Sequence, residues 1–248
     1  MTNASIRLAL GALLALVGAG AAAPAVARSD LTGTWERYPA PGEKAADPRY
    51  APSAIPAPPL KPEYQGPWDI QQKKLAARIE EGQPAGDNYV HCIPDGMPAM
   101  MMGMFPMEII QRPEQINITQ EAFNQTRRIY MNQPLPAWDA IDPSFFGRSV
   151  GHWDGDTLVV ETTGVKDYVT FRWAPHSESM KITERISLLA PDYLKDEITV
   201  QDDHLRAPWV WSWTFHRLKD YKIQEYVCEN NREYVDEKGN TRLRLEPK

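Results

Sequence analysis

The feature that most constrains the fold is a change of hydrophobic period after Met107. From there the chain reads as short segments in which apolar and polar residues alternate, separated by turns. Ile116 and Ile118 fall on one face of such a segment and polar residues on the other, and a two-residue period is typical of half-buried β-strands. Asp154-Gly155 lies between two of these segments, which predicts a tight β-hairpin.

The alternating segments are too many and too short for a helical protein. The predicted strands cover residues 31–38, 107–112, 115–121, 126–131, 148–154, 157–163, 180–189, 193–202, 208–217 and 221–230, and a last hairpin turns at Lys238-Gly239-Asn240. Consecutive hairpins favour an all-β, antiparallel up-and-down β-barrel over a sandwich, because closure removes exposed strand edges. No repeat of fixed period is visible, which argues against a propeller.

The N-terminus is typical of a signal peptide. Arg7 precedes an apolar run over residues 8–23, and Ala25-Val26-Ala27 fits the small-x-small rule for cleavage. We therefore expect residues 1–27 to be removed and the protein to be periplasmic or secreted. A retained membrane anchor is the weaker alternative, since no stop-transfer pattern follows the apolar run.

Removal of the signal peptide leaves roughly 220 residues, enough for one large β domain. Residues 28–86 contain the first strand, a proline-rich stretch over 39–67 and a predicted helix over 68–82 that begins after Pro67. Prolines favour extended backbone, so we expect this stretch to be an arm on the surface of the domain. Residues 87–248 form the barrel domain, completed by part of 28–86.

Charge and cysteine content restrict the partners and the compartment. The net charge is −6 and basic residues form no stripe, which argues against a nucleic-acid partner. Cys92 and Cys228 are the only cysteines. In an exported chain two distant cysteines favour one disulfide over two buried thiols. The bond would tie the segment around Cys92 to a predicted strand of the barrel wall.

Three carboxylates share a strand face with apolar residues. Glu184 alternates with Ile182 and Ile186, and Glu225 and Asp196 have similar surroundings. A carboxylate on an apolar face has to be paired, hydrogen-bonded or protonated, because burial of an isolated charge is very costly. The candidate counter-charges are Arg127, Arg128 and Arg185.

These carboxylates support two hypotheses that the sequence leaves open. One is a structural network of ion pairs inside the barrel. The other is an acid–base site in which a desolvated carboxyl group transfers a proton, with His176 in the loop before the Glu184 strand as its partner. The candidate catalytic residues are His176, Glu184, Glu225 and Arg128.

An aromatic stripe runs along one face of the segment 208–217. A barrel of about eight strands encloses only its own side chains or one small ligand, so such a stripe fills the core or lines a cavity. We favour a cavity for an apolar or aromatic molecule. The predicted lining residues are Trp209, Trp211, Trp213, Phe215, Tyr130, Met101 and Met104.

Residues 91–107, HCIPDGMPAMMMGMFPM, contain six methionines. Thioethers bind Cu(I), which makes a periplasmic copper protein one hypothesis. Methionine also fills irregular apolar gaps, and the run is interrupted by Pro98, Ala99 and Gly103 rather than by polar residues, which favours an apolar lid over one barrel mouth. The histidines show no paired zinc-ligand spacing, so we predict no metal and no cofactor.

Two motifs resemble known families. Gly33-Thr34-Trp35 is similar to the Gly-x-Trp signature of lipocalin-like (calycin) barrels, in which the tryptophan closes one barrel end. SVGHWDGDTLVVETTGV (149–165) and PHSESMKITER (175–185) resemble a widespread family of exported bacterial proteins. The second resemblance implies a Gram-negative source and transfers no catalytic assignment.

Three functions follow from these patterns. The first is an exported barrel that binds a hydrophobic or aromatic small molecule. The second is a cofactor-independent lyase, isomerase or hydrolase that acts on such a molecule through the buried carboxylates. The third is a copper-handling protein. The sequence leaves open whether the chain is an enzyme, which ligand it binds and whether it forms oligomers.

Overall fold

The structure is a computed structural model that describes residues 28–82, 92–228, 233–235, 237 and 241–243. The predicted signal peptide, residues 1–27, and the predicted final turn at 238–240 lie outside the described residues. Among the helices that the structure describes, none is long and apolar enough to cross a membrane.

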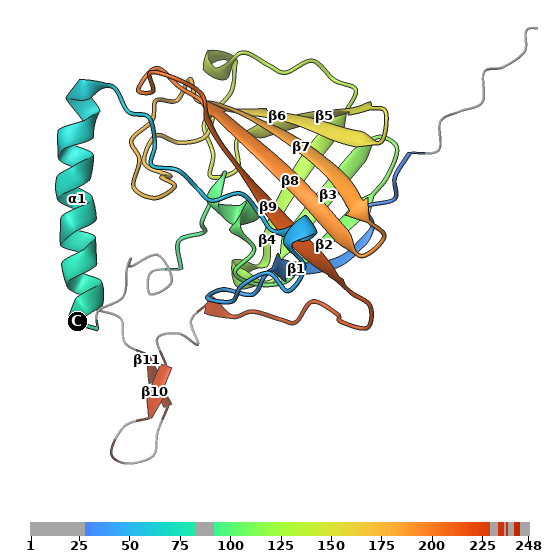
Figure 1. The fold of residues 1–248 in the computed structure, drawn as a ribbon, viewed down its shortest axis with the longest axis horizontal. Coiled ribbons are helices and arrows are strands. Elements are labelled where there is room, and N and C mark those ends of the chain that lie inside the picture. The colour runs from blue at the N-terminus through green and yellow to red at the C-terminus, as the bar shows by residue number, and fades with distance from the viewer. Residues whose placement is uncertain (1–27, 83–91, 229–232, 236, 238–240, 244–248) are drawn as a thin grey trace, which may run out of the picture.

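Nine strands form a closed barrel in the order in which they follow one another in the chain (Figure 1). The strands are β1 (Gly33–Tyr38), β2 (Met107–Gln111), β3 (Gln115–Gln120), β4 (Gln125–Met131), β5 (Arg148–Asp154), β6 (Thr157–Thr163), β7 (Lys181–Ala190), β8 (Tyr193–Gln201) and β9 (Trp209–Leu218). Strand β1 pairs with both β2 and β9 and so closes the ring. The predicted β-barrel is therefore confirmed.

One neighbouring pair departs from an up-and-down order. Strands β4 and β5 are parallel, whereas every other adjacent pair of the barrel is antiparallel. A parallel pair needs a long connection that returns to the starting end. Residues 132–147 supply it, with a short 3-10 turn, η4 (Trp138–Ala140), on the way.

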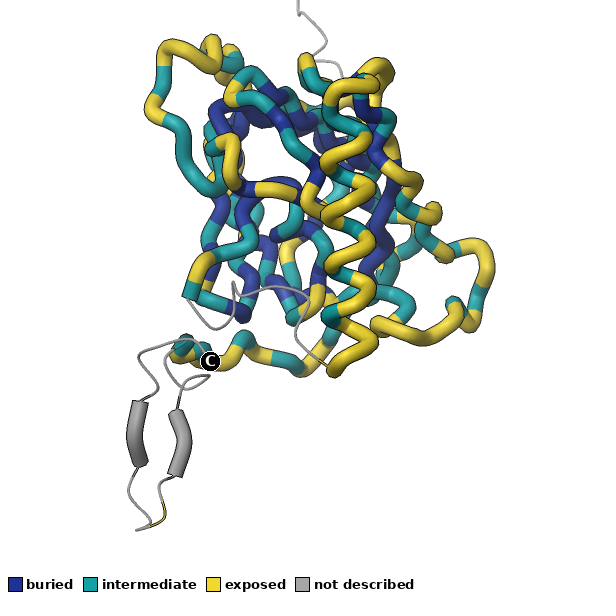
Figure 2. Tube along the Cα trace, turned by 90° about the vertical axis from the view of Figure 1, so that its left-hand side faces the viewer, coloured by how far each residue is buried: buried dark blue, intermediate teal, exposed yellow. Residues whose placement is uncertain are grey.

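Helix α1 (Pro62–Glu80) stands outside the barrel, where Figure 2 shows it mostly exposed. It begins earlier than the sequence predicts: Pro62 occupies the first turn, and Pro67 lies inside the helix. No residue of α1 is buried. The indole of Trp68 donates a hydrogen bond of 3.0 Å to the carbonyl oxygen of Arg172, which holds the helix against the loop before β7.

The strand predicted over 221–230 does not form in the described part of that range. Residues 221–227 pair with no strand, because β1 already occupies the free edge of β9, and residues 229 and 230 lie outside the described residues. The segment crosses the β3–β4 turn instead, where the Tyr221 hydroxyl donates to Glu121 Oε2 at 2.6 Å. A separate two-stranded sheet follows, formed by β10 (Glu233–Val235) and β11 (Thr241–Leu243), as predicted.

The predicted disulfide between Cys92 and Cys228 is present. It joins the methionine-rich segment to the extended segment 221–228 and not to a strand of the barrel wall. The nearby Asn124 side chain donates a hydrogen bond of 2.9 Å to the Tyr226 carbonyl oxygen. The bond therefore links two segments at the barrel end that holds the β3–β4 turn.

The opposite end is closed by Trp35, as the resemblance to lipocalin-like barrels implies. Its indole donates a hydrogen bond of 3.0 Å to the Leu31 carbonyl oxygen, and the Arg217 guanidinium lies 4.0 Å from the ring centroid. Gly33 has a φ of +145°, a conformation that favours glycine, and a Cβ atom there would push the Arg217 guanidinium away from its place. We call this the tryptophan end.

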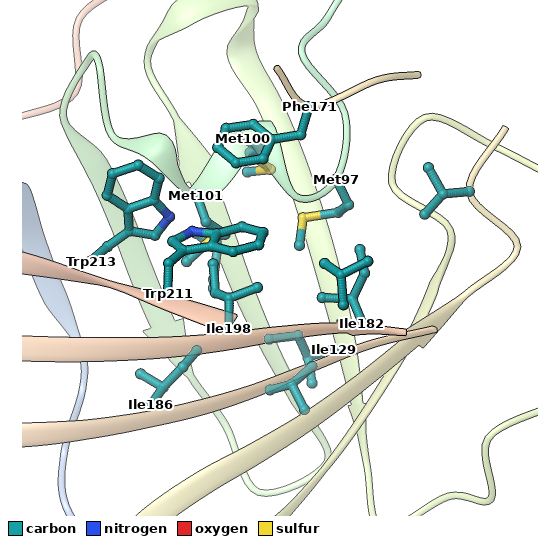
Figure 3. Close-up of a cluster of buried hydrophobic side chains, with 14 of the residues drawn as sticks. Met97, Met100, Met101, Ile129, Phe171, Ile182, Ile186, Ile198, Trp211 and Trp213 are labelled. Carbon is teal, nitrogen blue, oxygen red and sulfur yellow. The ribbon is translucent and has the colours of Figure 1, made fainter. Parts of the chain in front are cut away.

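Methionines close the other end. Met97, Met100 and Met101 are buried and point into the barrel mouth, where they pack with Phe171 and the core isoleucines (Figure 3). We call these three residues the methionine plug. The short 3-10 turn η2 (Ala99–Met102) carries two of them, and Gln120 Nε2 donates to the Met100 carbonyl oxygen at 3.2 Å. The apolar lid predicted from the sequence matches this arrangement.

Candidate ligand-binding site

A paired polar network crosses the barrel interior. Arg127 of β4 donates to both carboxylate oxygens of Glu184 of β7, with a distance of 2.8 Å between Nη1 and Oε1. It also donates to the hydroxyls of Ser149 and Thr162 at 3.0 and 2.8 Å. The two ionic side chains are almost completely buried. The prediction that Arg127 or Arg128 pairs with Glu184 is therefore confirmed for Arg127.

Asp196 of β8 lies beside this network. It is fully buried, and neither of its oxygens accepts a hydrogen bond from a described residue, but its carboxyl group is in hydrogen-bond reach of Glu184. Burial, reinforced by the negative charge of Glu184, raises the pKa of Asp196 well above its ordinary value. A raised pKa favours the protonated carboxyl group, which can donate a hydrogen bond as well as accept one.

The aromatic stripe of β9 faces the interior, as its spacing predicts. Trp209, Trp211, Trp213 and Phe215 are all buried. The Trp209 indole donates to the Pro56 carbonyl oxygen at 2.9 Å, but the indole N–H groups of Trp211 and Trp213 have no partner among the described residues. Their nitrogens point toward one another in Figure 3, with Met101 beside them.

Arg37 of β1 is the second arginine that faces inward. Its main chain is paired with that of Phe215, and its guanidinium lies 4.9 Å from the centroid of the Trp213 ring. Among the described residues, the one contact between its charged group and a hydrogen-bonding atom is a weak one, 4.0 Å from Nη1 to the sulfur of Met104. Its Nε is buried without a partner, and burial lowers the pKa of Arg37. Arg37 is thus a half-buried cation without a counter-ion in the described part of the chain.

A small apolar hollow opens beside the plug. It is large enough for about one water molecule. Its lining residues come from the segment before η2, the loop before β7, β8, the loop between β8 and β9, and the start of β9: Pro98, Phe171, Ala174, Pro175, His176, Met180, Val200, Asp202, Leu205 and Trp209. Buried core side chains pack around this hollow, so a ligand larger than the hollow has to displace some of them.

The structure does not bring His176 to Glu184. The two ring nitrogens of His176 lie 2.8 and 2.7 Å from the carbonyl oxygens of Ser177 and Val169. Both oxygens of Glu184 are engaged by Arg127. The predicted proton-transfer pair is therefore wrong, because every polar atom of both side chains already has a different partner.

Four other predicted site residues lie away from the interior. Arg128 is exposed on the outer face of β4, and Tyr130 shares that face, where it packs against Arg148. Ile129 and Met131 occupy the inner face, so the prediction that Tyr130 lines a cavity is wrong. Glu225 is exposed because its segment forms no strand. Met104 is largely exposed beside Arg37, whereas Met101 is buried in the plug.

The sequence predictions missed Arg37 and Phe171. The signal for Arg37 was present, since it lies two residues after Trp35 on a strand and therefore shares its inward face. Phe171 lies in a loop, and its ring stacks on Trp211 at a centroid distance of 5.0 Å. No periodic pattern marks a loop residue for burial.

Metal ligands do not gather in the described residues, in which no group of three or more histidine, cysteine, aspartate or glutamate side chains could hold an ion. The methionine plug packs among apolar side chains of the core.

Comparison with known proteins adds little to this picture. No family model and no curated protein matches the chain, so the resemblance to an exported bacterial family stays a prediction. One solved structure with a partial match is the crystal structure of a mutant of the fluorescent protein UnaG. It is 13% identical, with a TM-score of 0.30, and the match covers 46% of this chain and 72% of that chain.

Proposed function

We propose that this protein is an exported barrel that binds an apolar or aromatic small molecule at its plugged end. The observation that carries the proposal is the nature of the closure. The tryptophan end is held by a hydrogen bond and a cation–π contact, whereas the plugged end is filled by three methionines. Methionine side chains are unbranched and adopt many rotamers, so they can move aside for an apolar guest.

The walls of the plugged end suit such a guest. Phe171, Trp209 and Trp211 form a cluster with ring centroids 4.8 to 5.5 Å apart, and the hollow lies against two of these rings. Pockets for small apolar molecules have mainly aromatic and aliphatic walls with few polar groups. Export is supported by the N-terminal residue pattern and by the disulfide, since disulfides persist in oxidising compartments.

A fluorescence titration with N-phenylnaphthylamine tests the proposal. The free dye is weakly emissive in water, and we expect saturable enhancement together with quenching of the tryptophan emission. Val200→Phe, which places a larger side chain in the hollow, should weaken binding about tenfold or more, because an overpacked site costs about 1–3 kcal/mol.

Val210→Phe is the matched control, because Val210 is on the outer face of β9 and largely exposed. It should leave the affinity unchanged. Dye binding that is absent, or that responds equally to the two variants, would contradict the proposed site.

A further inference from the structure

We infer that the small molecule carries a carboxylate, which is held at the plugged end by the guanidinium of Arg37 and the indole N–H groups of Trp211 and Trp213. This inference rests on the proposed function and names the chemistry of the ligand. It starts from the polar atoms inside the barrel that have no partner, since buried polar groups in folded proteins almost always have one.

Arg37 supplies the charge. In proteins an arginine that is removed from water is normally paired with a carboxylate or a phosphate. Arg37 has no such partner among the described residues, and its guanidinium lies over Trp213, with Met104 on one side. Its position on β1 at the plugged end leaves it reachable from outside the barrel.

Trp211 and Trp213 supply two further donors. Both side chains are almost completely buried, and neither indole nitrogen has an acceptor in the part of the chain that the structure describes. An indole N–H donates a hydrogen bond and cannot accept one, so neither indole can be the acceptor for the other, although the two nitrogens point toward one another in Figure 3. A single oxygen-bearing group placed between them would satisfy both.

Asp196 also lies on this inner face. Its main chain is paired with that of Trp213, so the two side chains share the inner face of the sheet. Burial raises the pKa of Asp196, which favours its uncharged form and lessens its repulsion of an anion. Arg37, Trp211 and Trp213 can only donate hydrogen bonds, and a carboxylate is a group that only accepts.

The apolar remainder of the ligand would take the place of the methionine plug. Met101 lies beside the two indole nitrogens in Figure 3, and Met97 and Met100 continue toward Phe171. Rotation of these side chains would open a path from the donors to the hollow. The ligand class is thus an amphipathic monocarboxylate with an aliphatic or aromatic body.

Matched acids and alcohols test the inference by isothermal titration calorimetry. Laurate is compared with lauryl alcohol, and naphthoate with naphthalenemethanol. Charge-assisted hydrogen bonds should make each acid bind about tenfold or more tightly than its alcohol. Arg37→Met should remove this preference, Arg37→Lys should keep part of it, and Arg49→Met, an exposed control, should leave it intact.

A second measurement follows the indole N–H resonances of ¹⁵N-labelled protein. With the acids, the Trp211 and Trp213 signals should shift downfield, whereas the Trp209 signal should move less, because that N–H is already bonded to Pro56.

The outcomes separate the two proposals. Equal binding of acid and alcohol, or a preference that survives Arg37→Met, overturns the carboxylate inference and leaves the proposed function standing. Failure of all four compounds to bind, together with failure of the dye, overturns both.

Discussion

Two arginines face the interior of the same barrel, and their surroundings differ completely. Arg127 is buried and donates to Glu184, Ser149 and Thr162, so each of its nitrogens has an acceptor. Arg37 is half-buried at the plugged end, and within the described part of the chain its guanidinium has the sulfur of Met104 as its one hydrogen-bond acceptor. The first arrangement is complete without a ligand, and the second becomes complete only when an acceptor arrives from outside. Burial of polar groups alone therefore does not distinguish a structural network from a ligand-binding site. The two are distinguished by the number of buried polar atoms that have no hydrogen-bond partner.

The largest loss of stability is expected when the buried Arg127–Glu184 network is broken. Arg127→Met leaves the Glu184 charge buried and unpaired, which should lower the free energy of unfolding by about 3–5 kcal/mol. The double change Arg127→Met with Glu184→Leu should recover a large part of that loss, because no charge then remains without a partner. Urea unfolding provides the measurement.

Arg128→Met is the control for this change, since Arg128 is the exposed neighbour on the same strand. It should change stability by no more than about 0.5 kcal/mol. Equal losses for Arg127→Met and Arg128→Met would show that the network does not hold the barrel together.

The second prediction concerns the pH dependence of stability that Asp196 causes. Its folded-state pKa is raised, so the folded protein binds a proton that the unfolded chain has released above about pH 4. The stabilisation from this proton is complete below the unfolded pKa and is lost as pH rises toward the folded pKa. Stability should therefore decline by up to about 1.4 kcal/mol per pH unit over this window.

Asp196→Asn should flatten this part of the profile, because an amide does not titrate. Urea midpoints measured between about pH 5 and 8 would test it, with the exposed Asp139→Asn as control. A wild-type slope that Asp196→Asn leaves unchanged would assign the pH dependence to other groups.

A smaller effect compares two tryptophans. Trp35→Phe removes an indole that donates to Leu31, whereas Trp213→Phe removes one without an acceptor. The two changes remove the same atoms, and each ring lies under an arginine. Trp35→Phe should therefore destabilise the protein more, by about 1 kcal/mol, the net contribution of one hydrogen bond. Thermal and urea unfolding would detect this difference, and a larger loss for Trp213→Phe would contradict it.

The smallest effect is expected for the unpaired arginine. Arg37→Met removes a cation–π contact and no ion pair, so the free protein should lose less than about 1 kcal/mol. A loss as large as that of Arg127→Met, measured by the same urea unfolding, would show that Arg37 has a structural role instead of a receptive one.

Much of the barrel interior could be predicted from the alternation of side chains between the two faces of each strand. The period of two correctly placed Glu184, Asp196 and the β9 tryptophans inside the barrel, and it made Arg127 a candidate partner. The same parity, applied to β4, places Tyr130 outside with Arg128, so that error was avoidable.

Other features depend on contacts that no local pattern encodes. Residues 221–230 alternate like a strand, but pairing needs a free edge, and β1 from the far end of the chain had taken it. The parallel pairing of β4 and β5 and the burial of Phe171 depend likewise on how loops return across the barrel.

The position of the disulfide gives strand β1 a special status. Cys92 and Cys228, 136 positions apart, enclose β2 to β9 in one covalent ring, and β1 lies outside it. Strand β1 is held between β2 and β9 by non-covalent contacts alone. If β1 withdrew, the covalent ring would remain as an eight-stranded sheet with a seam open along its whole side. The strand that closes this seam also carries Arg37. Any movement of β1 away from β2 and β9 would therefore open the barrel wall and displace the Arg37 cation at the same time.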